Sequence, residues 1–192
     1  MTAGTTEPYP ARLTIDYPDR DLDRLSTGLR IIYVIPIEIL VNLIGGVLFL
    51  PVAALIVVRQ KYPRWLFDFN LELTRLTTRA GSYAALMSDE YPSSDEEQNV
   101  HLEVDYPDVQ QDLNRWMPLV KWLLAIPHFI VLILLGVAAM AAVIVTWFIV
   151  LFTGRYPRGI FDFVEGVFRW ALRVEAYAFL LTTDTYPPFS LD

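Results

Sequence analysis

The first candidates for chemistry in this 192-residue chain are three polar side chains inside its two long apolar stretches. Glu38 and Asn42 lie in the first stretch, and His128 lies near the start of the second. A carboxylate in an apolar segment is costly and often marks a functional site, such as a proton relay. Asn42 follows Glu38 by one helical turn, so the two side chains would share a helix face. The structural alternative is a protonated Glu38 bonded to Asn42, or a carboxylate that reaches the membrane surface.

His128 does not have the companions that a metal site needs. The chain contains two histidines and no cysteine, and the other histidine, His101, lies in a predicted strand. Zinc sites use at least three protein ligands, so we expect no metal or other cofactor, and we expect His128 to pack or to contact a headgroup. The sequence also contains no glycine-rich phosphate loop, nucleophile elbow or metal-binding helix motif. These observations disfavour an enzyme.

An acidic residue followed by two arginines at helical spacing occurs twice. The residues are Asp68, Arg75 and Arg79, then Asp162, Arg169 and Arg173, with Arg64 and Arg158 beside them. One interpretation is structural: the pairs Glu72–Arg75 and Glu165–Arg169 would each contribute a few tenths of a kcal/mol to a helix. The other is a basic shelf that binds anionic lipid headgroups or a partner. Both interpretations stay open at this point.

Two apolar stretches must position these side chains. The chain is 54% hydrophobic with a mean hydropathy of +0.38. Residues 117–152 would make a helix of about 54 Å, which exceeds the ~40–45 Å of a whole bilayer, so we expect this stretch to fold back. Residues 29–58 are interrupted by Pro36 and Pro51, and either one tilted span or a bent hairpin would fit.

The basic residues favour hairpins. If each stretch crossed once, the 15 Lys and Arg residues would divide almost evenly between the two sides of the membrane. If each stretch returns, all of them lie on one face, as the positive-inside rule requires. We therefore expect transmembrane hairpins with tips near Gly45-Gly46 and residues 136–142, and a re-entrant first hairpin because its legs are short. The expected location is the inner (cytoplasmic) membrane, multi-pass, with both termini in the cytoplasm.

The chain repeats itself over nearly its whole length. Leu13-Thr-Ile-Asp-Tyr-Pro-Asp19 returns as Leu102-Glu-Val-Asp-Tyr-Pro-Asp108, and Lys61-Tyr-Pro-Arg returns as Arg155-Tyr-Pro-Arg. We read residues 1–98 and 99–192 as two copies of one unit. Each contains a short strand, an apolar stretch (29–58 or 117–152) and an amphipathic helix (64–87 or 158–181). The sequence thus predicts an all-α integral membrane protein with short surface strands that pair across the repeat.

Several segments resemble one bacterial membrane-protein family, DUF4389. They are Arg155-Tyr-Pro-Arg-Gly-Ile-Phe-Asp-Phe163, Arg169-Trp-Ala-Leu-Arg-Val-Glu-Ala-Tyr177, Thr183-Asp-Thr-Tyr-Pro-Pro-Phe-Ser-Leu191 and Ile126-Pro-His128. In the first copy, Ile35-Pro-Ile37 lacks the histidine and Trp65 replaces the small residue after Tyr-Pro-Arg. The resemblance implies a prokaryotic, often actinobacterial, membrane protein, and it implies no activity.

Charge and polarity leave two classes of function. The net charge of −7 offers no basic face for phosphates, so we expect no nucleic-acid partner. A non-enzymatic accessory or scaffold subunit would bind membrane lipids and other membrane-protein subunits, or itself through residues 136–142. The alternative is a homo-oligomeric lipid-handling, channel or transport protein. That role would need a polar lining, which only Glu38, Asn42, His128 and Thr146 would supply.

Overall fold

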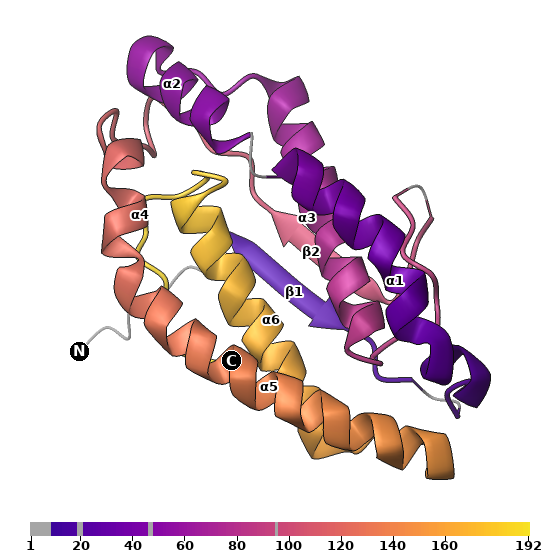
Figure 1. Ribbon diagram of the computed structural model, residues 1–192. Coiled ribbons are helices and arrows are strands. Elements are labelled where there is room, and N and C mark those ends of the chain that lie inside the picture. The colour runs from indigo at the N-terminus through magenta and orange to yellow at the C-terminus, as the bar shows by residue number, and fades with distance from the viewer. Residues whose placement is uncertain (1–8, 19–20, 46–47, 95) are drawn as a thin grey trace.

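The computed structural model describes residues 9–18, 21–45, 48–94 and 96–192. The chain is mostly helical, with two short antiparallel strands. The elements, in order, are β1 Ala11–Ile15, α1 Arg24–Gly45, α2 Phe49–Arg59, α3 Arg64–Ala84, β2 Val100–Val104, the 3₁₀ turn η1 Met117–Leu119, α4 Lys121–Leu124, α5 Ile126–Thr153 and α6 Arg158–Ala178 (Figure 1).

The two predicted strands are present and pair with each other. β1 and β2 form an antiparallel ribbon in which Leu13 lies opposite Leu102. Side chains alternate between buried and exposed along both strands, as a ribbon with one covered face requires. The buried side chains belong to the main hydrophobic core, and the exposed ones include Arg12 and Glu103. Each strand supplies the backbone partners that the other lacks.

The two predicted amphipathic helices, α3 and α6, cover the buried face of the ribbon. Each begins directly after a Tyr-Pro pair, whose proline lies in an extended conformation outside the helix, at Pro63 and Pro157. α3 contacts β2 and α6 contacts β1, while the opposite sides of these helices contact α1 and α5. The positions of both helices match the prediction, although each ends three residues earlier than expected.

The second apolar stretch is not a hairpin, so that prediction was wrong. α5 runs without interruption through residues 136–142, where the tip was expected, and ends at Gly154, which has a φ of 77°. Gly136 costs a helix only about 1 kcal/mol relative to alanine, and no proline follows Pro127 within the stretch. Nothing in the local sequence therefore opposes a continuous helix. α5 is the one helix of the described residues that is long and apolar enough to cross a membrane.

The first apolar stretch forms two helices instead of a hairpin with parallel legs. α1 contains Pro36 and runs to Gly45, and α2 carries Pro51 in its first turn, where the missing N–H is tolerated. Figure 1 shows α2 beyond the end of α1, near α4, and α3 lying along α1. One residue of the expected tip, Gly46, lies outside the described residues.

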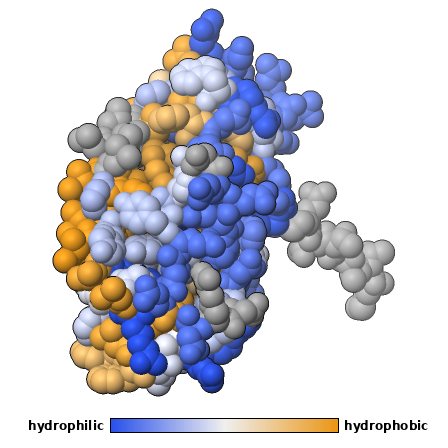
Figure 2. All heavy atoms as spheres, turned by 90° about the vertical axis from the view of Figure 1, so that its right-hand side faces the viewer, coloured by the Kyte–Doolittle hydropathy of each residue, from blue (hydrophilic) through white to orange (hydrophobic). Residues whose placement is uncertain are grey.

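The elements form three layers. α1 and α5 are outermost, α3 and α6 lie in the middle, and the ribbon is on the far side. Figure 2 shows that hydrophobic side chains gather on one side of the molecule and hydrophilic ones on the other. The exposed apolar side chains include Ile32, Ile39, Ile133, Leu134, Val137 and Phe152, all on α1 and α5. The two apolar stretches thus build a broad apolar face.

Candidate functional site: two buried ion pairs and four arginine contacts

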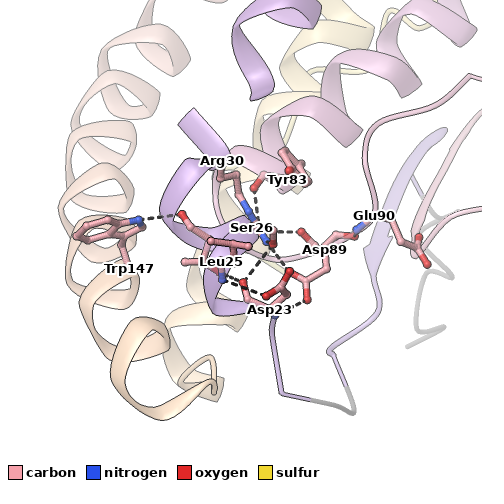
Figure 3. A network of polar contacts seen from close by, with 10 residues as sticks. Asp23, Leu25, Ser26, Arg30, Tyr83, Asp89, Glu90 and Trp147 are labelled. Carbon is pink, nitrogen blue, oxygen red and sulfur yellow. Dashed lines mark hydrogen bonds and ion pairs between the residues drawn. The ribbon is translucent and has the colours of Figure 1, made fainter. Parts of the chain in front are cut away.

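A buried ion pair joins the start of α1 to the segment that follows α3 (Figure 3). Arg30 is fully buried, and its guanidinium group pairs with the carboxylate of Asp89. The guanidinium group also donates hydrogen bonds to the carbonyl oxygens of Tyr83, at 3.2 Å, and Ser88, at 2.7 Å. The second oxygen of Asp89 accepts a hydrogen bond from the N–H of Asp23 at 2.9 Å. The charge of Arg30 is therefore compensated, which a buried cation requires.

A second buried ion pair has the same layout at the start of α4. Lys121 is fully buried, and its Nζ lies 2.7 Å from a carboxylate oxygen of Asp184. Nζ also donates to the carbonyl oxygen of Thr183 at 2.7 Å, and it lies 5.3 Å from the ring centre of Tyr177. The other Asp184 oxygen accepts from the N–H of Asn114 at 2.6 Å. Burial lowers the pKa of Lys121, and the neighbouring Asp184 opposes that shift.

Two of the predicted shelf arginines hold the ribbon. Arg75 on α3 donates from Nε to the carbonyl oxygen of Leu102 at 3.2 Å, and Arg169 on α6 donates to that of Leu13 at 3.1 Å. Arg169 also donates to the carbonyl oxygen of Leu191 at 3.0 Å. The predicted ion pairs Glu72–Arg75 and Glu165–Arg169 are both present, at 2.5 and 3.1 Å. These side chains therefore have a structural role in fixing helices to strands.

Two further arginines hold loop segments. Arg79 donates to the carbonyl oxygen of Ser93 at 2.5 Å. Arg173 is buried and donates to the carbonyl oxygens of Ser190, at 3.4 Å, and Asp192. Four of the six predicted shelf arginines are thus engaged with this chain's own backbone. Their binding of lipid or partner stays a prediction.

Arg64 and Arg158 differ because they remain largely exposed. Each forms an ion pair at 3.1 Å with the aspartate four residues later. The guanidinium carbon of Arg64 lies 4.6 Å from the ring centre of Tyr106, and that of Arg158 lies 4.5 Å from the ring centre of Tyr17. The hydroxyl of Tyr17 in turn donates to the carbonyl oxygen of Tyr156 at 2.5 Å. Of the six arginines of the predicted shelf, Arg64 and Arg158 are therefore the two that reach solvent most freely.

His128 is buried among aromatic rings. Its Nδ1 accepts a hydrogen bond from Nε1 of Trp170 at 3.0 Å, and its ring stacks on Phe189 at a centroid distance of 4.0 Å. Among the described residues, Nε2 of His128 has no hydrogen-bond partner, and no group of three potential metal ligands occurs. The contacts of His128 are those of a packed side chain.

The other two predicted polar residues belong to α1. Glu38 is half-buried. The side chain of Asn42 lies outside the part of the chain that the structure describes, so the Glu38–Asn42 pair stays a prediction. Sequence reasoning did not select Arg30, Lys121, Asp89 or Asp184, although each aspartate lies just before a closing Tyr-Pro segment of one copy. That recurrence was the available signal.

The fold and these contacts define a mostly helical protein with one candidate membrane-crossing helix and a paired strand ribbon. A family model described as "Domain of unknown function (DUF4389)" matches residues 24–94 and 115–190. The chain belongs to this family, as its motifs predicted. Each matched segment contains one complete buried ion pair. No curated protein and no solved structure gives a significant match.

Proposed function

We propose that this protein is a non-enzymatic membrane-surface protein that serves as an accessory or scaffold subunit of a larger membrane complex. The observation that carries the proposal is the separation of an apolar face from a hydrophilic face (Figure 2). Monomeric soluble proteins rarely expose contiguous apolar patches beyond a few hundred Å². An apolar face built from two long helices fits the hydrocarbon edge of one leaflet.

The layers favour an α5 that lies along the membrane surface over one that crosses the membrane. In Figure 1, the axes of α6 and β1 lie roughly along that of α5, and α6 runs back in the opposite chain direction. The outer side of the ribbon carries the exposed residues Arg12, Glu103 and Asp105, and Arg12 forms an ion pair with each of the two acids. If α5 stood upright in a bilayer, this charged ribbon would extend into the hydrocarbon region beside it. Each charge there costs several kcal/mol, so an in-plane α5 is the cheaper arrangement.

The tandem duplication is part of the proposal, and recurring contacts support it. The ribbon register places Leu13 opposite Leu102, which are equivalent positions of the two copies. Arg75 binds the carbonyl of Leu102, and its equivalent Arg169 binds that of Leu13. A two-fold axis through the ribbon would exchange these contacts. Such an axis would run through all three layers, along the membrane normal of the proposed orientation.

The same contacts disfavour a channel or transport role. His128 and Thr146 are fully buried within this chain, so neither side chain faces an oligomer axis. Ala139 is buried against this chain, whereas Gly136, Ala138 and Ala141 are exposed, so residues 136–142 still offer a small-residue face for self-association. The charged outer face of the ribbon is the surface that a partner subunit would reach from the aqueous side.

Single-cysteine labelling tests the in-plane orientation, and the chain has no native cysteine to interfere. Gln110→Cys precedes α5, and Arg155→Cys follows it, and both positions are exposed. In right-side-out and inverted vesicles, an impermeant reagent should label both positions from the same side. Labelling from opposite sides would establish a membrane-crossing α5 and refute the orientation.

Mass measurement of the gently extracted protein tests the accessory role. We expect foreign membrane subunits to co-purify with the wild type. Arg12→Glu on the ribbon should abolish this co-purification, and Arg155→Glu should leave it unchanged. Arg155 is the matched control because it is also an exposed arginine, 81% accessible, but lies away from the ribbon. A pure homo-oligomeric ring would contradict the accessory role and support the alternative.

A further inference from the structure

A cavity of about 570 Å³ lies between α1, α3, α5 and α6. This volume is in the range of small-molecule sites, about 300–1,000 Å³. α1 and α5 supply apolar wall residues such as Val41, Phe129 and Leu132. α3 and α6 supply a polar wall made of Asn70, Thr74, Thr77 and Glu175. The cavity therefore has one polar wall and apolar surroundings.

The hydrogen bonds of the polar wall leave acceptors open. Thr74 donates from Oγ1 to a carboxylate oxygen of Glu175 at 3.2 Å, and Thr77 donates to the backbone carbonyl four residues earlier at 2.8 Å. Asn70 donates from Nδ2 to the hydroxyl of Tyr62 at 2.8 Å, and its Oδ1 has no partner among the described residues. The two threonines donate within the chain and Oδ1 of Asn70 is buried, so the acceptor that a ligand meets is the half-buried carboxylate of Glu175.

These open acceptors select the charge of a ligand. Among the described residues that line the cavity there is no lysine or arginine, so nothing compensates a phosphate or carboxylate head. The ionised form of Glu175 repels such an anion, whereas a bound ammonium head favours that ionised form. Burial raises the pKa of Glu175, and the hydrogen bond from Thr74 only partly opposes this. An ammonium or hydroxyl group would instead donate to the carboxylate of Glu175.

A second hollow of about 440 Å³ continues from this cavity. Leu132 and Ala171 line both hollows, so the two adjoin. Small and apolar side chains line the second one, including Gly81, Gly136 and Ala139. It lies between α3, α5 and α6 and contains no charged residue among those described. The first cavity thus provides a polar end, and the second hollow extends it with an apolar space.

We propose that the cavity binds an amphiphile whose head, an ammonium or a hydroxyl group, donates a hydrogen bond to Glu175. Its apolar chain occupies the second hollow beside α5. The inference rests on the proposed membrane-surface location, because a lipid leaflet is where such a molecule would be encountered. The polar wall disfavours binding of anionic head groups. Binding measurements must then compare ammonium with hydroxyl head groups.

Calorimetric titration of the full chain in micelles of one uncharged detergent tests the proposal with three probes of equal chain length: dodecylamine, dodecanol and dodecanoate. Dodecylamine and dodecanol should bind one per chain, and dodecanoate should bind at least about tenfold more weakly. Glu175→Gln should weaken dodecylamine by about tenfold and dodecanol less, because only the amine pairs with the charge. Equal affinities for all three probes would mean unspecific partition and would overturn the proposal.

Two matched controls complete the design. Glu72→Gln removes a carboxylate from the same helix layer but outside the cavity and should leave all three titrations unchanged. Ala171→Phe fills the junction of the two hollows and should abolish binding of both neutral and cationic probes, whereas Ala54→Phe on the exposed side of α2 should not. Wild-type binding by Ala171→Phe would refute the site. Because these titrations involve no membrane, they fail or succeed independently of the cysteine labelling.

Discussion

The two buried ion pairs have one layout but different cations. Arg30 spreads its guanidinium group over Asp89 and two backbone carbonyls, whereas Lys121 places one ammonium between Asp184 and one carbonyl. A guanidinium group does not lose its proton in proteins, but a buried ammonium group does so readily. Arg30 therefore stays positively charged, whereas Lys121 can lose its proton.

Of the two buried cations, Arg30 therefore depends more strongly on its aspartate than Lys121 does. If its aspartate is removed, Arg30 remains a charge in the interior, whereas Lys121 can become neutral and escape most of the penalty. The two halves differ again at equivalent positions of α3 and α6. The first half has Gly81 where the second has Glu175, and only the second therefore adds a carboxylate to the central cavity.

The largest effect is expected from removing the aspartates. Asp89→Asn leaves the buried Arg30 unpaired and should lower the free energy of unfolding by about 3–5 kcal/mol. Asp184→Asn should cost clearly less, because Lys121 can release its proton. Chemical denaturation in detergent micelles measures both. Asp162→Asn breaks an exposed pair and should cost under about 1 kcal/mol, so it serves as the control. Equal losses at the two buried pairs would refute the comparison.

A smaller effect is expected from the arginines that hold the ribbon. Arg169→Gln loses hydrogen bonds to Leu13 and Leu191 and should cost about 1–3 kcal/mol. Arg75→Gln loses one backbone contact, to Leu102, and should cost less. Amide hydrogen exchange of the strands locates the loss: β1 should exchange faster in the first variant and β2 in the second. Unchanged exchange in both would mean that these contacts do not hold the ribbon.

Local periodicity was enough to predict the strands and the amphipathic helices. β1 and β2 alternate apolar and polar residues, and α3 and α6 carry a polar stripe at helical spacing, so each pattern is complete within one element. The predicted pairing of the two strands with each other was also correct, because a lone short strand leaves its backbone groups unpaired. These features depend on near neighbours in sequence.

The hairpin prediction failed for residues 126–153 because the charge argument compares whole topologies and does not test whether the stretch contains a break. The positive-inside rule orients segments that span, and it says nothing about a helix that lies along an apolar face. Length alone does not distinguish the two cases, since α5 is long enough for either. The proposed in-plane orientation rests instead on the packing of α5 against α6, whose other side contacts the charged ribbon.

The ion pairs were missed for a different reason. Arg30 and Asp89 are 59 residues apart, so no local spacing connects them. Glu175 gave no signal either, because its partner Thr74 reaches it from α3, in the other half of the chain. Side chains that meet only through the tertiary fold are outside the reach of motif and periodicity arguments.

The contrast between Gly81 and Glu175 predicts a pH dependence of stability. Burial raises the pKa of Glu175 in the folded state, so the folded chain holds this proton at pH values where the unfolded chain has lost it. The contribution of Glu175 to stability is therefore full below its unfolded pKa and is lost as the pH rises through its folded pKa. Unfolding measured between acidic and neutral pH should show this decline in the wild type. Glu175→Gln should remove that part of the decline, whereas Glu72→Gln should retain it; an identical slope in all three would contradict the shift.

The smallest effect is expected where arginines face outward. Arg64 and Arg158 stay largely exposed, whereas Arg75, Arg79, Arg169 and Arg173 bind this chain's own backbone. If the basic shelf binds anionic headgroups, the two exposed arginines should account for it, at about 1 kcal/mol of attraction per charge near the membrane. Native mass spectrometry should then show less anionic lipid retained by Arg64→Gln/Arg158→Gln than by the wild type, with a difference that shrinks as salt rises. Arg169→Gln/Arg173→Gln should retain as much lipid as the wild type while losing stability. The opposite ranking, with lipid lost from the second pair and not from the first, would show that backbone contacts do not prevent those arginines from binding headgroups.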